Sequence, residues 1–491
     1  MTSRRMWLIA GAVWAAALAL YLRTLAPTIT WANFGADGGD LISAAYFAGV
    51  PHPTGYPTYV TLGQLFTRLP VGSIAFRLNF MSALCLSGAA ALITLGLWRA
   101  MPSPRAGVAA LGGLSFAAAP AVWGQATIAE VYALNAWFVA ALSALLVPIV
   151  LQPDRSSARS LAAAFFLWGI GLGNHVTLVF LAPLVFAALI RAARFTRRLL
   201  LITRCTLPFV LGLCIYLLIP IRAAAQPPIN WLGDVTGPRL AAFLGGELYR
   251  PYALGAPLSE YPDRAAALAR LVVDQFGPIG LLLIVIGLEG SGRLPRRAAI
   301  ALGVVIALYT IFAVGYRPPD WPVYLIPVWL FAAWLSAYGA HRLIAWRRVG
   351  PGAARYTFYA LALVLVPGLI AATNFAAHDL SGDHRAGVFA REVWQAAPVG
   401  AILVTHDDAP TFTLWYYQLV EGQRRDTTIV DQRLAAYDWY APMLRAQNAP
   451  DAAPVLPPID PDDTWLDRLR AANVDRVVCD LQTEPVEWDC D

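Results

Sequence analysis

The sequence predicts an all-α polytopic membrane protein that carries a small α/β domain at its C-terminal end. Of its 491 residues, 58% are hydrophobic and 14% are charged, whereas a soluble domain has roughly 25% charged residues. The mean hydropathy is +0.56. About eleven apolar segments approach the ~20 residues that a helix needs to cross a bilayer. After Thr373 the long apolar segments stop, and the chain becomes rich in Asp, Pro and Arg.

The predicted membrane helices follow one another with short polar turns between them. They cover residues 6–22, 78–98, 106–124, 129–151, 160–173, 176–192, 199–220, 272–290, 298–315, 321–341 and 356–373. The pair at 160–192 is short and interrupted by Gly, Asn and His, so it could instead form one re-entrant unit. The first segment could be a signal peptide, but it has no small-residue cleavage site before Arg23, and we expect an uncleaved anchor.

The arginines predict the orientation, because cytoplasmic loops of membrane proteins are enriched in basic residues. With a cytoplasmic N-terminus, every internal loop is basic: Arg99 and Arg105, Arg155 and Arg159, Arg191 to Arg204, Arg293 to Arg297, and Arg342 to Arg355. The loops 23–77 and 220–270 and the region 374–491 then lie outside. We therefore expect a multi-pass protein of the bacterial inner (plasma) membrane, with residues 1–373 embedded and 374–491 forming an extracytoplasmic domain.

The C-terminal region shows strands that alternate with helices, which is typical of an α/β domain. The expected strands cover residues 401–405, 427–430 and 474–479, and residues 412–420 are expected to form a helix. Cys479 and Cys490 could form a disulfide if this region is exported, although their spacing alone does not decide it.

The first external loop contains two polar runs, Trp31–Asp40 and Gly49–Pro57. Ionisable groups at the membrane edge usually mark function. Asp37 and Asp40 could form a capping box for a helix over residues 41–47, or one of them could be a general base, and the two interpretations can coexist. His52 and Tyr56 lie between prolines that stiffen the loop, which suits either a preformed site or a structural elbow.

Further polar residues recur at the predicted outer ends of the helices. They are Arg77, Asn79, Glu130, Tyr132, Asn174, His175, Arg222 and Arg317. Any one of them could be an interfacial anchor, but together they indicate a site on the outer face. The sequence has no metal-binding signature, no P-loop and no dinucleotide fingerprint. The net charge of +5 does not indicate nucleic-acid binding.

Several of these motifs resemble a multi-pass family formerly catalogued as a domain of unknown function and now grouped with GT-C-type glycosyltransferases. That family includes a eukaryotic transmembrane O-mannosyltransferase of plexin-type receptors. The resemblance covers most of the chain and is most specific over its first 135 residues. The matching runs are Asp37 to Asp40, Gly49 to Pro57, Arg77 to Asn79, Ser82 to Leu84, Trp123 to Asn135, Gly169 to His175, Pro220 to Arg222, Pro227 to Trp231, Thr405 to Asp408 and Leu414 to Tyr417.

This resemblance implies a GT-C-like fold and an enzyme that moves a sugar, such as mannose, from a polyprenyl-phosphate carrier to an exported protein or glycan hydroxyl. It places the catalytic base, or a metal contact, at Asp37 with Asp40 as neighbour. The family usually has Glu at the position of Asp40, which is longer by one methylene. Arg77, Arg222 and Arg317 would bind the phosphate, while His52, Tyr56, Glu130 and His175 would shape the pocket.

The reaction is expected to invert the anomeric centre. No cofactor beyond the lipid-linked donor is expected, and the need for a divalent metal stays open. The alternative function is a transporter or flippase of lipid-linked sugars. Transporters often show repeated halves and charges near the membrane midplane, whereas here no repeat is visible and the charges lie at one face.

Overall fold

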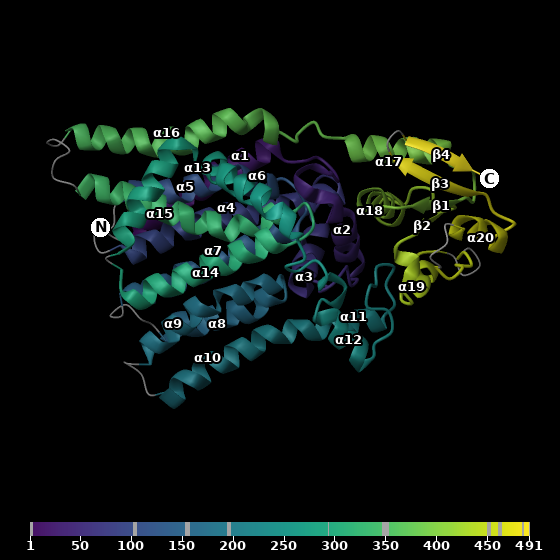
Figure 1. Cartoon of the computed structure of the whole chain (residues 1–491), viewed down its shortest axis with the longest axis horizontal. Coiled ribbons are helices and arrows are strands. Elements are labelled where there is room, and N and C mark those ends of the chain that lie inside the picture. The colour runs from purple at the N-terminus through teal and green to yellow at the C-terminus, as the bar shows by residue number, and fades with distance from the viewer. Residues whose placement is uncertain are drawn as a thin grey trace.

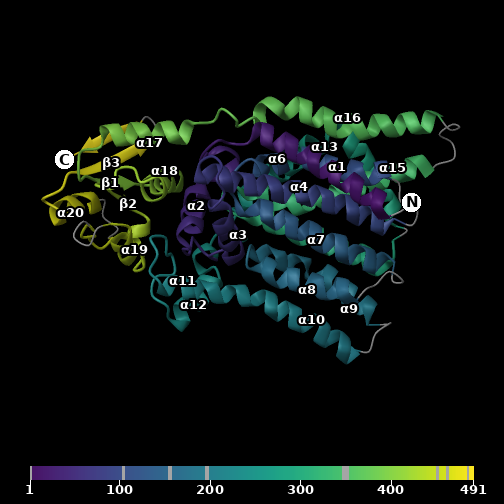
Figure 2. The same ribbon diagram turned by 180° about the vertical axis from the view of Figure 1, so that it is seen from behind.

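The computed structural model describes residues 3–101, 106–152, 158–193, 198–292, 294–345, 353–448, 453–459, 464–483 and 486–490. It consists of a bundle of long apolar helices with a small α/β domain at one end (Figure 1). The N-terminus and the C-terminal domain lie at opposite ends of this bundle in both side views (Figures 1 and 2). Several of the loop arginines used above to predict the orientation lie outside the described residues.

Each predicted apolar segment is helical over most of its length. The bundle comprises α1 (Ser3–Thr24), α4 (Ile74–Ala100), α5 (Ala106–Ala118), α6 (Pro120–Ala126), α7 (Val131–Leu151), α8 (Ala158–Leu172), η3 (Val176–Leu181), α9 (Ala182–Ala192), α10 (Arg198–Leu213), η4 (Cys214–Leu217), α11 (Leu218–Ala224), α13 (Tyr261–Ser291), α14 (Arg296–Gly315), η7 (Trp321–Leu325), α15 (Ile326–Ala345) and α16 (Ala353–His378).

Fewer of these helices meet the length expected for a membrane crossing than the sequence predicts. Among the described residues, 7 are long and apolar enough, or 8 if α5 and α6, which are bent by 67°, form one span. The remaining predicted segments correspond to shorter apolar helices at Ala158–Leu172, Val176–Ala192 and Leu365–His378. The first two are short because the chain turns between them at residues 173–175. The number of crossings therefore stays a prediction.

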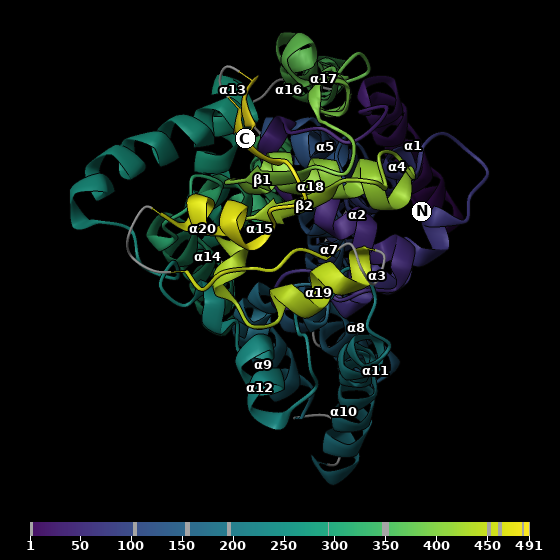
Figure 3. The same cartoon turned by 90° about the vertical axis from the view of Figure 1, so that its right-hand side faces the viewer.

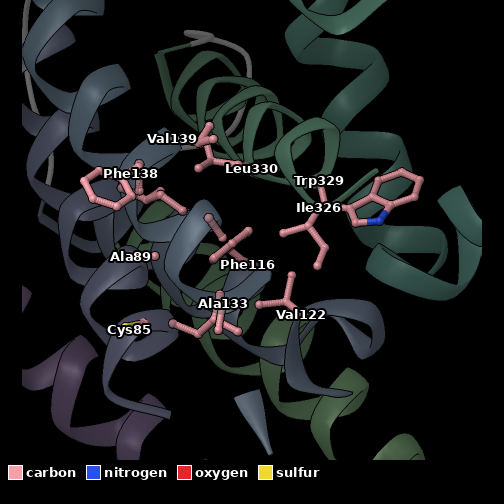
Figure 4. Packing of buried hydrophobic residues seen from close by; sticks show 14 of the residues in the cluster. Cys85, Ala89, Phe116, Val122, Ala133, Phe138, Val139, Ile326, Trp329 and Leu330 are labelled. Carbon is pink, nitrogen blue, oxygen red and sulfur yellow. The ribbon is translucent and has the colours of Figure 1, made fainter. Parts of the chain in front are cut away.

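The core of the bundle lies around α4 and α7, where small and large apolar side chains pack against one another (Figure 4). Ala89 of α4 and Ala133 of α7 are buried, as are Phe116 of α5 and Leu330 of α15. Small residues at such contacts let helix backbones approach closely, which favours association inside a membrane. This packing fixes the ends of α4 and α7, on which the outer loops rest.

The loop of residues 23–77, which the sequence predicts to be the first external loop and which keeps that name below, is largely helical. It contains η1 (Ala32–Asp37), α2 (Gly38–Phe47) and α3 (Pro57–Thr67). The helix predicted over residues 41–47 is confirmed, and α3 begins at Pro57, since proline is favoured in the first turn of a helix. The loop of residues 220–270, the second predicted external loop, holds α12 (Gly237–Leu244), η5 (Glu247–Tyr249) and η6 (Leu258–Glu260).

The C-terminal domain contains a four-stranded sheet in the order β2-β1-β3-β4. Its elements are α17 (Arg385–Ala396), β1 (Ile402–Thr405), α18 (Asp408–Trp415), the π-helix η8 (Tyr416–Val420), β2 (Thr428–Asp431), η9 (Leu434–Ala436), α19 (Tyr440–Gln447), α20 (Trp465–Ala472), β3 (Val478–Thr483) and β4 (Val486–Cys490). β1 pairs in parallel with β2 and β3, with Leu403 opposite both Ile429 and Cys479. β3 and β4 are antiparallel.

The α/β character of this domain is confirmed, although the bounds of its elements differ from the sequence-based expectation. The helix expected over residues 412–420 begins earlier, as α18 at Asp408, and ends as the π-helix η8. The third strand begins at Val478 rather than at residue 474. The fourth strand was not foreseen, and it pairs Cys479 opposite Cys490, which are joined by a disulfide. Helix α16 extends past residue 373 to His378, and within this extension Asn374 donates a side-chain hydrogen bond to the Ile370 carbonyl.

The C-terminal domain rests directly on the first external loop (Figure 3). Trp31 donates its indole N–H to the Thr413 hydroxyl (2.8 Å), and the Tyr416 hydroxyl accepts the backbone N–H of Ala75 (3.3 Å). At Gly39 of α2 the two parts approach so closely that a Cβ there would lie 2.0 Å from the Phe412 carbonyl oxygen. The domain is thereby held over the end of the bundle.

Gly39→Ala should therefore destabilise the docked arrangement by about 1–3 kcal/mol, because a backbone carbonyl cannot rotate away as a side chain can. Thermal unfolding in detergent, together with limited proteolysis of the C-terminal domain, would measure the loss. Gly303→Ala is the matched control, since that position lies in α14 with no atom within 4 Å of the added Cβ. Equal unfolding midpoints for the two variants would contradict the close contact.

Candidate active site

A cavity of about 430 Å³ lies where the first external loop meets the outer ends of α7, η3 and α14. Six of the site residues predicted from the sequence line this cavity: Asp37, His52, Tyr56, Glu130, Tyr132 and His175. They come from three separate parts of the chain. The structure thus gathers about half of the predicted site residues around one space.

Four side chains form a connected series that ends at the cavity. Trp231 donates its indole N–H to Asp40 Oδ1 at 3.0 Å. Asp40 Oδ2 accepts the backbone N–H of His52 at 3.0 Å and lies 2.7 Å from His52 Nδ1. On the other edge of the imidazole, Nε2 lies 3.8 Å from Asp37 Oδ2. Asp40 is fully buried, whereas 40% of the Asp37 side chain is accessible.

Backbone contacts between distant segments hold this series in place. Val50 donates its N–H to the Ile229 carbonyl (2.8 Å), and Trp231 donates its N–H to the Val50 carbonyl (3.0 Å). Gly49 is required beside this bridge, because a Cβ at that position would lie 2.4 Å from the Ile229 oxygen. Trp231 is therefore positioned against Asp40 by the second external loop, although the two residues are 191 positions apart.

The protein surroundings shift the protonation equilibria of these groups. Burial raises the pKa of Asp37 to about 7; His52 opposes this rise, while Asp408 and Asp320 add to it. Burial lowers the pKa of His52, but Asp37 and Asp40 outweigh that effect and raise it to about 9. Burial lowers the pKa of His175 to about 4. At neutral pH the cavity thus contains a cationic His52, a neutral His175 and an Asp37 carboxyl poised between its two forms.

Aromatic rings and two further acids, Asp320 and Glu130, complete the walls. Tyr56 stacks on His175, with ring centroids 6.2 Å apart. The Tyr132 hydroxyl donates towards Asp320 Oδ2 at 3.4 Å, and it lies 3.2 Å from the Tyr324 hydroxyl. Glu130 caps α7 by accepting the Val131 N–H, while its Oε1 is buried with no hydrogen-bond partner in the described part of the chain.

The other predicted residues are engaged in holding backbone segments. Asn79 donates to the carbonyls of Ala26 (2.9 Å) and Thr28 (3.0 Å), which fixes the start of the first external loop. Asn174 donates to the Val131 carbonyl at 3.1 Å and so ties the turn after α8 to α7.

The three arginines proposed to bind phosphate do not line the cavity. Arg77 donates to the carbonyls of Val71 (2.8 Å) and Gly72 (3.1 Å), so its guanidinium closes the turn between α3 and α4. Arg222 donates to Thr61 Oγ1 (2.9 Å) and Gln64 Oε1 (3.0 Å) beside α3. Arg317 is exposed, and its backbone N–H donates to the Tyr252 carbonyl.

The capping-box interpretation of the two acids does not describe the structure. Asp37 precedes α2 but makes no side-chain capping bond, and the carboxylate of Asp40 is bound to His52 and Trp231 instead. The two acids thus have different surroundings: Asp40 is enclosed, and Asp37 faces the cavity.

Sequence reasoning did not select several residues of the cavity. Tyr249 and Arg250 come from the run Tyr249–Tyr252, and Asp320 and Tyr316 come from the run Tyr316–Trp321. Both runs combine polar and aromatic residues in predicted outer loops, and this pattern is the sequence feature that could have identified them. Among the described residues, Arg250 is the one arginine that lines this cavity.

Solved structures define the class of fold. The chain aligns with ArnT from Cupriavidus metallidurans bound to undecaprenyl phosphate, with a TM-score of 0.54 and 16% identity over 88% of this chain and 90% of that one. It also aligns with the archaeal oligosaccharyltransferase AglB from Archaeoglobus fulgidus, solved with an inhibitory peptide and a dolichol-phosphate, with a TM-score of 0.51 and 13% identity over 90% and 72% of the chains. The protein therefore has the membrane-embedded GT-C glycosyltransferase fold.

Within this class, parts of the chain are similar to the TMEM260 protein O-mannosyl-transferases. Residues 37–198 match the model of the TMEM260 N-terminal domain, and residues 386–465 match TMEM260-associated domain 2. The mouse protein O-mannosyl-transferase TMEM260 is 29% identical over 88% of this chain, and the Dictyostelium discoideum protein is 24% identical over 93% of it. The chain spans 64% and 61% of the lengths of these relatives. Both organisms are eukaryotes, so the comparison does not support the expected bacterial location.

Proposed function

We propose that this protein transfers a sugar, such as mannose, from a polyprenyl-phosphate carrier to a hydroxyl of a protein or glycan on the extracytoplasmic face of a membrane. The observation that carries the proposal is Asp37, which faces a cavity of about 430 Å³ with a pKa raised to about 7 and with His52 held against it by Asp40. The similarity to protein O-mannosyl-transferases and the GT-C fold support it.

Asp37 is the proposed general base. A base works best when its pKa lies near the operating pH, which is the position that burial gives Asp37. The acceptor hydroxyl gives its proton to the Asp37 carboxylate while its oxygen bonds to the anomeric carbon. The bond from that carbon to the phosphate oxygen breaks, and its electron pair leaves with the polyprenyl phosphate. A single displacement of this kind inverts the anomeric centre.

Arg250 is the proposed contact for the leaving phosphate, because preorganised cations stabilise developing negative charge. Arg222 is a second candidate at the membrane side. The Thr61 side chain that accepts its hydrogen bond also lines an apolar groove of about 460 Å³ between α3, α4, α7 and α8. Leu62, Leu134 and Phe138 line the same groove. We place the polyprenyl chain there, with its phosphate near Arg222 before transfer.

The test is an assay of the purified protein with radiolabelled polyprenyl-phosphate mannose and extracytoplasmic proteins from cells that lack this chain. If the protein transfers the sugar, the assay should yield equal amounts of released polyprenyl phosphate and labelled acceptor. Movement of the intact donor between leaflets, with no bond broken, would instead establish the transporter alternative.

The rate of transfer should depend on pH through Asp37. Because its carboxyl group must be ionised to accept a proton, the rate should rise as the pH rises through about 7. His52→Gln removes the positive charge that lowers the pKa of Asp37, so the rising limb should move to higher pH by about one unit or more. Single-turnover rates between pH 5 and 9 would check this, and an unmoved limb in His52→Gln would contradict the coupling.

A further inference from the structure

A second, smaller cleft of about 280 Å³ lies between the second external loop and the C-terminal domain. Its walls include Pro53, Trp231, Arg239, Glu247, Tyr437 and Trp439. Pro53 also lines the cavity around Asp37, so the cleft adjoins the proposed active site. None of the roles assigned above uses this cleft.

Stacked aromatic rings form one wall of the cleft. Trp231 lies against Trp439 with ring centroids 4.7 Å apart, and Trp439 stacks on Tyr437 at 5.7 Å with an interplanar angle of 20°. The two tryptophans are buried, whereas 38% of Tyr437 is exposed. The buried rings give Tyr437 a rigid support, and its accessible surface offers an aromatic contact to a ligand.

Charged side chains of both signs flank the aromatic wall. Arg239 of α12 forms an ion pair with Asp438 of the C-terminal domain, and Glu247 of η5 lies nearby and is exposed. Trp, Tyr and Arg are the residues most enriched at the energetic centres of protein–protein interfaces. Because a folded or extended polypeptide presents both apolar and charged groups, this mixture of side chains fits a polypeptide better than a lipid.

Trp231 connects the cleft with the proposed base. Its ring forms part of the aromatic wall, and its indole N–H is the hydrogen bond that holds Asp40, which in turn holds His52. A ligand in the cleft would thus contact Trp231, the side chain that helps to position Asp40 and His52 next to Asp37.

We propose that this cleft binds the acceptor polypeptide beside the serine or threonine that receives the sugar, a proposal that rests on the proposed function. The C-terminal domain then contributes to acceptor recognition through Tyr437 and Trp439, while the membrane bundle binds the donor. An acceptor held there extends past Pro53 and presents its hydroxyl to Asp37.

The test measures KM and kcat separately for extracytoplasmic acceptor proteins from cells that lack this chain, with polyprenyl-phosphate mannose at saturation. Tyr437→Ala and Arg239→Ala should each raise the acceptor KM by about tenfold and change kcat by less than twofold. Tyr46→Ala is the matched control, because that tyrosine is 44% exposed and lies in neither cavity. Thermal unfolding of all three variants would test whether they are folded.

Acceptor KM values that stay unchanged in both cleft variants would overturn the proposal. A labelled product that resists protease and is degraded by glycosidases would also overturn it, because the acceptor would then be a glycan. If the wild-type protein releases no polyprenyl phosphate with any acceptor, the proposed function fails instead, so the two failures are distinguishable.

Discussion

Asp37→Asn is expected to reduce the rate of sugar transfer by about 10²–10⁴-fold, the usual contribution of a positioned general base. Asparagine has nearly the same shape as aspartate but cannot accept the proton of the acceptor hydroxyl. Because Asp37 makes no capping bond and lies at the edge of the cavity, the substitution should leave the fold unchanged. The measurement is kcat for labelled mannose transfer by the purified protein.

The control is Asp475→Asn, an exposed aspartate of the C-terminal domain that contacts neither cavity. It should transfer at the wild-type rate. Full turnover by Asp37→Asn would show that another group takes the proton, and the assignment of Asp37 would fail.

Asp40→Ala is expected to cost about 3–5 kcal/mol of unfolding free energy, because it removes one partner of a buried charged pair. The variant leaves His52 Nδ1 and the Trp231 indole N–H without their acceptor in an enclosed site. Transfer should also fall, since His52 is no longer fixed opposite Asp37. Thermal unfolding in detergent and the transfer assay measure the two effects.

Asp234→Ala provides the comparison for stability, because this aspartate is exposed in the second external loop. It should change the unfolding free energy by less than about 0.5 kcal/mol. Equal unfolding midpoints for Asp40→Ala and Asp234→Ala would contradict the supporting role of Asp40.

The polar loop before α3 could be identified from the sequence because its features are local. An acid pair, a histidine and three prolines next to an apolar helix are visible without the fold, and Asp37, His52 and Tyr56 do line one cavity. The apolar segments are equally local, since hydropathy alone locates them. The resemblance to GT-C glycosyltransferases then supplied the fold, which the structural comparisons support.

The arginines show what the sequence could not provide. Whether an arginine side chain lines the cavity depends on how the fold places the segment that carries it. Arg77 donates hydrogen bonds to the turn that precedes α4, and Arg222 donates to Thr61 and Gln64 outside the cavity. Arg250, in contrast, lines the cavity. Likewise, the contact between Trp231 and Asp40 joins residues from two external loops, and no local pattern encodes it.

The proposed reaction requires the anomeric carbon of a lipid-linked sugar to lie next to Asp37. The most direct test is an electron cryo-microscopy structure of the Asp37→Asn protein with polyprenyl-phosphate mannose bound. We expect the sugar in the cavity between Asn at position 37 and Arg250, with room for an acceptor oxygen about 3–3.5 Å from the anomeric carbon. A sugar bound elsewhere, with the cavity at residue 37 unoccupied by the donor, would contradict the proposal.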